Sequence, residues 1–93
     1  MVKKFNLLYL IKKIKDVMRL DIKVRLFATL REGRGKELFV DLDEPLTPMH
    51  IVDKLNIPIE EVAILLINGR DGQLNTLLTE GDVVSIFPPV GGG

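Results

Sequence analysis

The sequence DIKVRLF, residues 21–27, alternates apolar and polar side chains, and this period of two decides the fold. Alternation places every second side chain on the same face of a β-strand. A second alternating stretch, ELFVDL at residues 37–42, follows a loop over residues 30–35 that ends in Gly33-Arg34-Gly35. The two stretches predict a β-hairpin, which Glu44-Pro45 ends.

A helix is predicted next. Thr47 is suited to the N-cap position and Pro48 to the first helical position. Leu46 before the cap and Ile51 four positions after it form a hydrophobic staple. Asn56 and Pro58 end the helix, and a short helical turn is expected over residues 59–62.

Further strands complete the sheet. The run ILLI, residues 64–67, is continuously apolar and predicts a strand buried on both faces or nearly so. Asn68-Gly69 and Asp71-Gly72 predict turns, and residues 83–87 the last strand. The fold class is therefore α+β: a mixed sheet of about four strands with one main helix on one face. This is the ubiquitin-like β-grasp architecture.

Residues 1–20 form an N-terminal extension that precedes the β-grasp domain of residues 21–88 and the tail of residues 89–93. Three interpretations stay open: an amphipathic helix that packs on the body or on a second copy, a membrane-surface or partner helix, and an upstream extension before a native start at Met18. Its apolar residues recur at helical spacing: Leu7, Leu10, Ile11, Ile14, Val17 and Met18.

Composition limits the chemistry. The 93 residues make one small domain without cysteine, so disulfides, thiolate metal sites and thiol nucleophiles are excluded. His50 is the one histidine, and we expect no metal site and a surface or boundary place for it. No apolar run reaches the roughly 20 residues that span a bilayer, so no membrane partner is expected. We expect an intracellular, cytoplasmic protein.

Charge is unevenly divided. Residues 1–20 carry a net charge of +5, and residues 21–93 carry −5 because the whole chain is neutral. An acidic body argues against nucleic acid as its partner and favours a basic protein surface.

Strand parity places three phenylalanines, Phe27, Phe39 and Phe87, on the open face of the sheet. We expect them to form one apolar docking patch. Two alternatives remain: the N-terminal helix covers them, or a bulge shifts the parity. The parity rests on an inward set of apolar residues: Ile22, Val24, Leu26, Leu38, Val40, Leu42, Val84 and Ile86.

The chain ends FPPVGGG, residues 87–93. Pro88 and Pro89 donate no N–H, so they end the strand and hold the tail away from the sheet. Gly92 and Gly93 have no Cβ and fit a channel too narrow for other residues. The body offers no catalytic constellation, so the terminal carboxylate is the predicted reactive group; a frayed, inert tail is the alternative.

From residue 21 to residue 93 the chain resembles the MoaD/ThiS family of prokaryotic sulfur carriers, above all the small subunit of molybdopterin synthase. The resemblance rests on EGDVVSIFPPVGGG at residues 80–93, on VRLFA with LRE at residues 24–32, and on ING at residues 67–69. It does not cover the first seventeen residues. Gly91 departs from many members, which have another residue before the last two glycines.

The resemblance implies a mechanism in which an E1-like enzyme uses ATP to adenylate Gly93, and a sulfur donor protein then converts it to a thiocarboxylate. The tail would insert into the large subunit of molybdopterin synthase, with the protein itself non-catalytic and no cofactor bound. The implied contact residues join the strand-parity set: Phe27, Phe39, Phe87, Pro88, Pro89, Val90 and Gly91.

Three other functions stay open: a thiamine-pathway sulfur carrier, a ubiquitin-like modifier conjugated through Gly93, and a plain binding module. The sequence does not separate molybdenum from tungsten cofactor synthesis.

Overall fold

The computed structural model describes residue 7, residues 20–42 and residues 46–90. The predicted N-terminal helix, the strand end at Glu44-Pro45 and the three terminal glycines lie outside the described residues, save Leu7 and Leu20. In chain order the elements are β1 (Leu20–Leu26), a 3₁₀ helix (Ala28–Arg31), β2 (Glu37–Leu42), α2 (Pro48–Lys54), a 3₁₀ helix (Ile59–Glu61), β3 (Ile64–Ile67), β4 (Arg70–Asp71) and β5 (Val83–Phe87).

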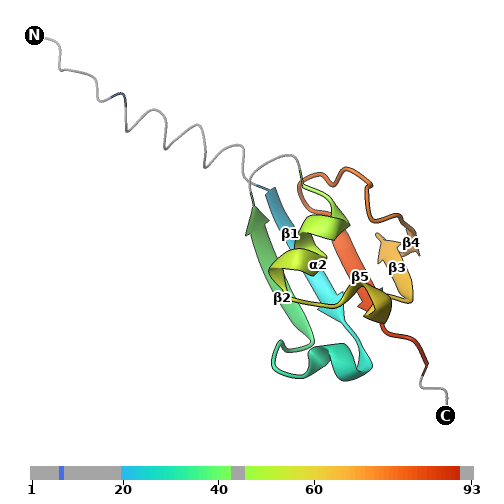
Figure 1. The fold of residues 1–93 in the computed structure, drawn as a ribbon. Helices are drawn as coiled ribbons and strands as arrows, with labels where there is room; N and C mark the ends of the chain where they lie inside the picture. Colours follow the sequence, from blue (N-terminus) through green and yellow to red (C-terminus); the bar gives the residue numbers. More distant parts are fainter. Residues whose placement is uncertain (1–6, 8–19, 43–45, 91–93) are drawn as a thin grey trace, which may run out of the picture.

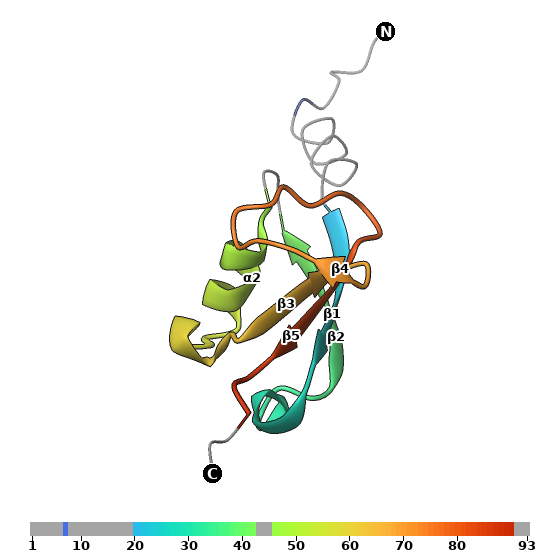
Figure 2. The ribbon, with the colours of Figure 1, turned by 90° about the vertical axis from the view of Figure 1, so that its right-hand side faces the viewer.

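The strands form one mixed sheet in the order β2-β1-β5-β3-β4. Its centre is the parallel pair β1 and β5, and every other neighbouring pair is antiparallel. α2 crosses one face of this sheet (Figure 1), and the side view shows helix and sheet as two layers (Figure 2). The arrangement is the predicted ubiquitin-like β-grasp.

The sheet has five strands, where about four were predicted. The additional strand, β4, has two residues, both charged, and neither type favours a strand. Asn68 and Gly69, both at positive φ, make the tight turn that joins β3 to β4. Gly72 N–H then donates to Leu65 O at 3.0 Å, so Asp71-Gly72 continues the pairing and is not the predicted turn.

The start of α2 is fixed by its own sequence. Thr47 is the N-cap and Pro48 the first helical residue, as predicted. Thr47 N–H donates to Nδ1 of the exposed His50 at 3.0 Å, so this histidine belongs to the helix cap. Both staple residues, Leu46 and Ile51, are buried.

The end of α2 is held by an arginine from the β1–β2 connection. Arg34 donates from Nε to Leu55 O at 2.9 Å and from its terminal nitrogens to Leu30 O and Asn56 O, both at 3.1 Å. These bonds satisfy carbonyls that a helix end leaves without partners inside the helix. One guanidinium thus ties the helix end to the loop.

That connection is more ordered than the predicted loop. It contains the first 3₁₀ helix, and its Leu30 is completely buried. Gly33 and Gly35 both adopt positive φ, which explains why glycine stands at each position. A buried leucine in a short helical turn anchors the connection to the core.

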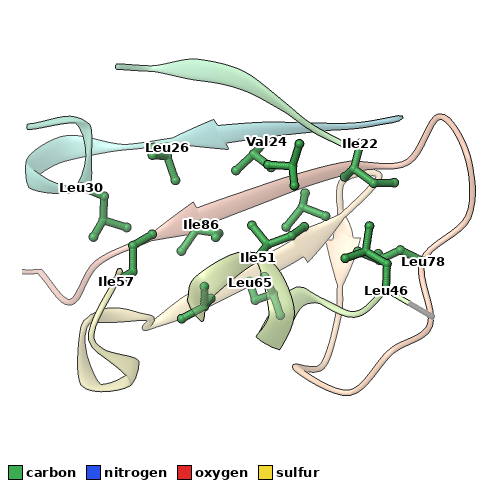
Figure 3. Close-up of a cluster of buried hydrophobic side chains, with 13 residues drawn as sticks. Ile22, Val24, Leu26, Leu30, Leu46, Ile51, Ile57, Leu65, Leu78 and Ile86 are labelled. Carbon is green, nitrogen blue, oxygen red and sulfur yellow. The ribbon is translucent and has the colours of Figure 1, made fainter. Parts of the chain in front are cut away.

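The core lies between α2 and the sheet (Figure 3). Six of the eight residues predicted to face inward are buried; Leu38 is half-buried against the core, and the side chain of Leu42 lies outside the described set. The strand predicted over residues 64–67 is confirmed, but its predicted burial on both faces was wrong, because Ile64 is 50% exposed and α2 covers only one face of that strand. The buried set is Ile22, Val24, Leu26, Leu30, Val40, Leu46, Ile51, Val52, Ile57, Leu65, Leu78, Val84 and Ile86.

Within the part of the chain that the structure describes, no helix is both long and apolar enough to cross a membrane.

Candidate functional site

The chain leaves the sheet abruptly at the end of β5. Phe87 O accepts a hydrogen bond from Ala63 N–H at 2.9 Å, and the next two residues, Pro88 and Pro89, have no N–H to continue the ladder. Pro88 is half-buried, Pro89 is exposed, and Val90 is 91% exposed. The last described residue of the tail therefore projects into solvent at the end of the sheet (Figure 2).

Two of the predicted phenylalanines meet where the tail departs. Phe27 N–H donates to Ile86 O at 3.2 Å, which extends the pairing of β1 with β5 by one residue. The rings of Phe27 and Phe87 stack with centroids 4.0 Å apart and planes within 9°. Both rings are half-buried, and the stacking covers one side of each.

Ile64 completes this apolar cluster. The register pairs Ile64 of β3 with Phe87 of β5, and paired residues share a face of the sheet. Phe27, Ile64 and Phe87 therefore lie side by side on three neighbouring strands, with Ile64 half exposed. We call these three residues the tail-side patch.

Arg31 lies over this patch. Its Nε donates to Leu26 O at 2.8 Å, and its guanidinium carbon stands 5.3 Å from the centre of the Phe27 ring. A cation held over an aromatic face is attracted by the negative potential of the ring. The patch therefore has a charged rim on its β1 side.

Phe39 is not part of the patch, which corrects the expectation of a single cluster of three rings. It pairs with Lys23, four positions along β1 from Phe27, and four residues of strand span about 13 Å. The row between them is polar, with Glu37 and Arg25. Phe39 is 63% exposed, and Lys23 Nζ stands 5.9 Å from its ring.

A shallow polar hollow of about 570 Å³ adjoins the root of the tail. Ligand pockets for small molecules are mostly apolar and enclosed, and this hollow is neither. The residues that line this hollow are Thr29, Glu32, Arg34, Glu61, Pro88 and Pro89.

Among the described residues no group of three or more His, Cys, Asp or Glu side chains could hold a metal ion.

Sequence reasoning identified Phe27, Phe87 and the prolines at this end of the sheet but missed Ile64 and Arg31. The continuous apolar run of β3 hid the parity of Ile64, since alternation cannot be read where every residue is apolar. Pairing Ile64 with Phe87 requires the register, which only the folded sheet supplies. Gly91, Gly92 and Gly93 lie outside the described residues, so their predicted roles stay predictions.

Comparisons with known proteins point to one family. A model described as the ThiS family matches residues 24–93. The chain is 33% identical over 93 aligned positions, 80% of this chain and 100% of the other, to small archaeal modifier protein 3 of Haloferax volcanii.

Solved structures of similar fold include subunits of the molybdopterin-converting factor. Putative molybdopterin converting factor subunit 1 from Pyrococcus furiosus superposes with a TM-score of 0.64 at 27% identity, covering 76% of this chain and 99% of that one. In the complex of subunits 1 and 2 of the molybdopterin-converting factor from Helicobacter pylori, the matching chain gives a TM-score of 0.54 at 26% identity, with 80% and 100% covered.

Proposed function

This chain belongs to the ThiS family, and we propose that it carries sulfur on its own C-terminal carboxylate, at Gly93, for molybdopterin synthesis. It is a small ubiquitin-like carrier or modifier protein. The observation on which the carrier chemistry chiefly rests is the geometry of the tail. A proline-interrupted segment leaves the sheet beside the tail-side patch and is 91% exposed at Val90.

The chemistry follows from the carboxylate. A terminal carboxylate is ionised at neutral pH and is a poor electrophile, so it must be activated before it accepts a nucleophile. Attack of a Gly93 carboxylate oxygen on the α-phosphorus of ATP forms the acyl-adenylate and releases pyrophosphate. A sulfide equivalent from a sulfur donor protein then attacks the acyl carbon, AMP leaves, and a thiocarboxylate remains. We assign ATP binding to an E1-like partner.

The tail-side patch supplies the docking surface for these partners. A partner that covers Phe27, Ile64 and Phe87 removes half-exposed apolar side chains from water, and the gain scales with the area buried. The tail starts at the same place, so docking aims it at the partner. Four residues from Val90 reach roughly 13 Å into a channel.

Molybdopterin synthesis is the pathway that we propose, with a molybdopterin synthase large subunit as the receiving partner. Its support is the similarity to two subunits named for the molybdopterin-converting factor, one of them in complex with its subunit 2. The sequence FPPVGGG at residues 87–93 supports the same assignment.

A second candidate function is protein modification. The relative at 33% identity is named a small archaeal modifier protein. In that case the amine of a target lysine, in place of sulfide, attacks the acyl-adenylate, AMP leaves, and Gly93 becomes joined by an isopeptide bond.

Intact mass distinguishes the two candidates. The full chain is incubated with the E1-like enzyme of its own organism, ATP and a sulfur donor. Exchange of one carboxylate oxygen for sulfur supports the carrier, and covalent conjugates of higher mass support the modifier. Addition of the large subunit and cyclic pyranopterin monophosphate then tests the pathway, since the dithiolene forms only if the sulfur is transferred.

Deletion of Gly93, or Gly92→Trp, should abolish loading and transfer without changing the thermal unfolding temperature. The unfolding temperature should stay unchanged because Val90, at the start of the tail, is almost fully exposed and so adds little to the core. Gly91→Ala serves as the milder control and should keep most of the loading. Loss of several degrees of thermal stability in the deletion variant would contradict a free tail.

A further inference from the structure

We propose that the polar hollow at the root of the tail receives a basic side chain of the enzyme that activates Gly93, and that this contact fixes how the enzyme is oriented about the tail. The inference deepens the proposed function and rests on it, because it names the chemistry of the partner surface that encloses the tail. We call the hollow lined by Thr29, Glu32, Arg34, Glu61, Pro88 and Pro89 the tail-root hollow.

The tail leaves the domain between two short helical turns. Pro88 and Pro89 line the hollow together with Glu32, which ends the first 3₁₀ helix, and Glu61, which ends the second. The side view shows the last described residues of the tail passing between these two turns (Figure 2). A partner that encloses the tail therefore meets both glutamates.

Backbone hydrogen bonds fix the positions of both glutamates. Glu32 N–H donates to Thr29 O at 3.1 Å, which closes the end of the first 3₁₀ helix. Two residues after Glu61, Ala63 N–H donates to Phe87 O at 2.9 Å and ties the second 3₁₀ helix to the strand from which the tail departs. The fold itself therefore places a carboxylate on each side of the tail root.

Neither carboxylate is neutralised by a direct contact within the described part of the chain. Glu32 and Glu61 are both exposed, and among the described residues neither side chain forms a hydrogen bond or an ion pair. Arg34 lines the same hollow, but its guanidinium donates to three backbone carbonyls at the end of α2 and in the first 3₁₀ helix. The negative charge of the hollow is therefore available to a partner.

The open-face side of the tail root carries the opposite charge. There the guanidinium of Arg31 stands 5.3 Å from the centre of the Phe27 ring, and this arginine does not line the hollow. Complementary charges fix the register in which two surfaces dock, because like charges brought together repel. An enzyme rotated about the tail would place its basic side chain against Arg31, so one orientation is favoured.

The activation reaction independently requires a basic partner. Adenylation brings the Gly93 carboxylate against the α-phosphate of ATP, so the enzyme has to hold two anions together with positive charge or backbone donors. Residues 21–93 carry a net charge of −5, and an acidic body is attracted to such a surface. The sign of the partner's charge thus follows from the chemistry as well as from the hollow.

The basic side chain in the hollow is distinct from the groups that hold the reacting carboxylate. The four residues from Val90 to Gly93 span up to roughly 13 Å. Exposed charges farther apart than about 8–10 Å are largely screened at physiological salt. The enzyme therefore needs a separate lysine or arginine at the mouth of the channel, where the tail-side patch meets its apolar wall.

The test is the association rate of the full chain with the E1-like enzyme of its own organism, measured by stopped flow in the presence of ATP. The variant with both Glu32→Lys and Glu61→Lys should associate at least about tenfold more slowly at an ionic strength of about 0.01 M. At about 0.5 M salt the difference should shrink to less than about threefold, because salt screens the charges.

A matched double variant, Asp53→Lys with Glu60→Lys, controls for overall charge. It changes the net charge by the same amount, both residues are exposed, and neither lines the hollow, although Glu60 precedes Glu61 directly. Its association rate should stay within about threefold of the unmodified chain. Both double variants should keep the unfolding temperature, because all four substituted residues are exposed.

Steady-state adenylation, followed by pyrophosphate release, gives a second measurement. Reversal of charge in the hollow should raise KM for the carrier chain at least about tenfold at low salt and leave kcat within about twofold, because the reacting carboxylate is unchanged. A merely structural role would not produce a KM effect that salt removes.

Three results would overturn the inference. Equal slowing of the two double variants assigns the effect to overall charge, and an unchanged rate in the hollow variant removes the hollow from the interface. Slowing that persists at high salt shows that the contact is not electrostatic. The proposed function fails separately, since it fails only if the unmodified chain releases no pyrophosphate with the enzyme and ATP, and the inference then falls with it.

Discussion

The two faces of the sheet are built from alternate residues of the same strands, yet one is buried and the other carries exposed apolar side chains. On the covered face Ile22, Val24 and Ile86 are completely buried under α2. On the open face Phe39 and Ile64 are 63% and 50% exposed. Burial on one face stabilises the domain, and exposed apolar surface on the other is available to partners. A substitution should therefore affect stability or binding according to its face.

The largest effect on stability is expected from Leu26→Ala. Leu26 is completely buried in the core, and truncation of a buried leucine costs about 2–5 kcal/mol through lost transfer energy and the cavity left behind. Urea denaturation of the full chain measures the change in unfolding free energy. A loss below about 1 kcal/mol, well under the usual range, would show that the covered face does not carry the stability.

Arg34→Met should lower the unfolding free energy by less than Leu26→Ala does. The variant tests how much stability comes from the arginine that holds the end of α2. Three backbone carbonyls lose a charged donor, and a hydrogen bond to a charged group contributes about 1.5–3 kcal/mol. We expect a loss of about 2 kcal/mol in urea denaturation, less than the sum of the bonds because water replaces some of them.

Arg34→Lys is the matched control for charge. Lysine keeps the positive charge but cannot reach three carbonyls with one planar group. It should recover less than half of the lost stability. Full recovery would mean that charge alone, and not the fork of hydrogen bonds, holds the helix end.

Phe87→Ala should have the smallest effect on stability of these variants. Its effect on partner binding should be larger than its effect on folding. Loss of the ring removes a stacked pair worth about 0.5–1.5 kcal/mol to the fold. An aromatic residue at the centre of an interface often contributes 2 kcal/mol or more, so affinity for the E1-like enzyme should fall at least about tenfold.

Phe39→Thr is the open-face control for this experiment, measured by calorimetric titration with the same enzyme. Phe39 lies about 13 Å along the sheet from the tail-side patch, so its loss should leave that affinity within about twofold. Equal losses from both variants would restore the single patch of three rings that the alternation predicted.

Sequence reasoning succeeded where local chemistry is decisive. Thr47 and Pro48 predicted the start of α2, because cap and first-turn preferences depend on neighbouring residues alone. Alternation predicted the inward set of β1, β2 and β5 for the same reason. It failed for β3 and β4, where a uniform apolar run and a charged pair carry no period.

The candidate site divides in the same way. The residues from Phe87 to Val90 showed by themselves that the strand ends and the tail departs, because proline lacks the N–H that a ladder needs. Arg31 reaches the Phe27 ring through the 3₁₀ helix between them, in a connection that was predicted only as a loop. Ile64 joined the site only through its pairing with Phe87, a contact between segments distant in sequence. No local pattern encodes such a contact.

By itself, the sequence determined the β-grasp class, the start of the helix and the inward residues, and it predicts a reactive end at Gly93. Only the tertiary structure decided that Phe27 stacks on Phe87 beside Ile64, that Phe39 stands apart, and that β5 lies between β1 and β3. The reason is physical. Periodicity, caps and prolines act within a few residues, whereas register and strand order arise when distant segments pack around a shared core.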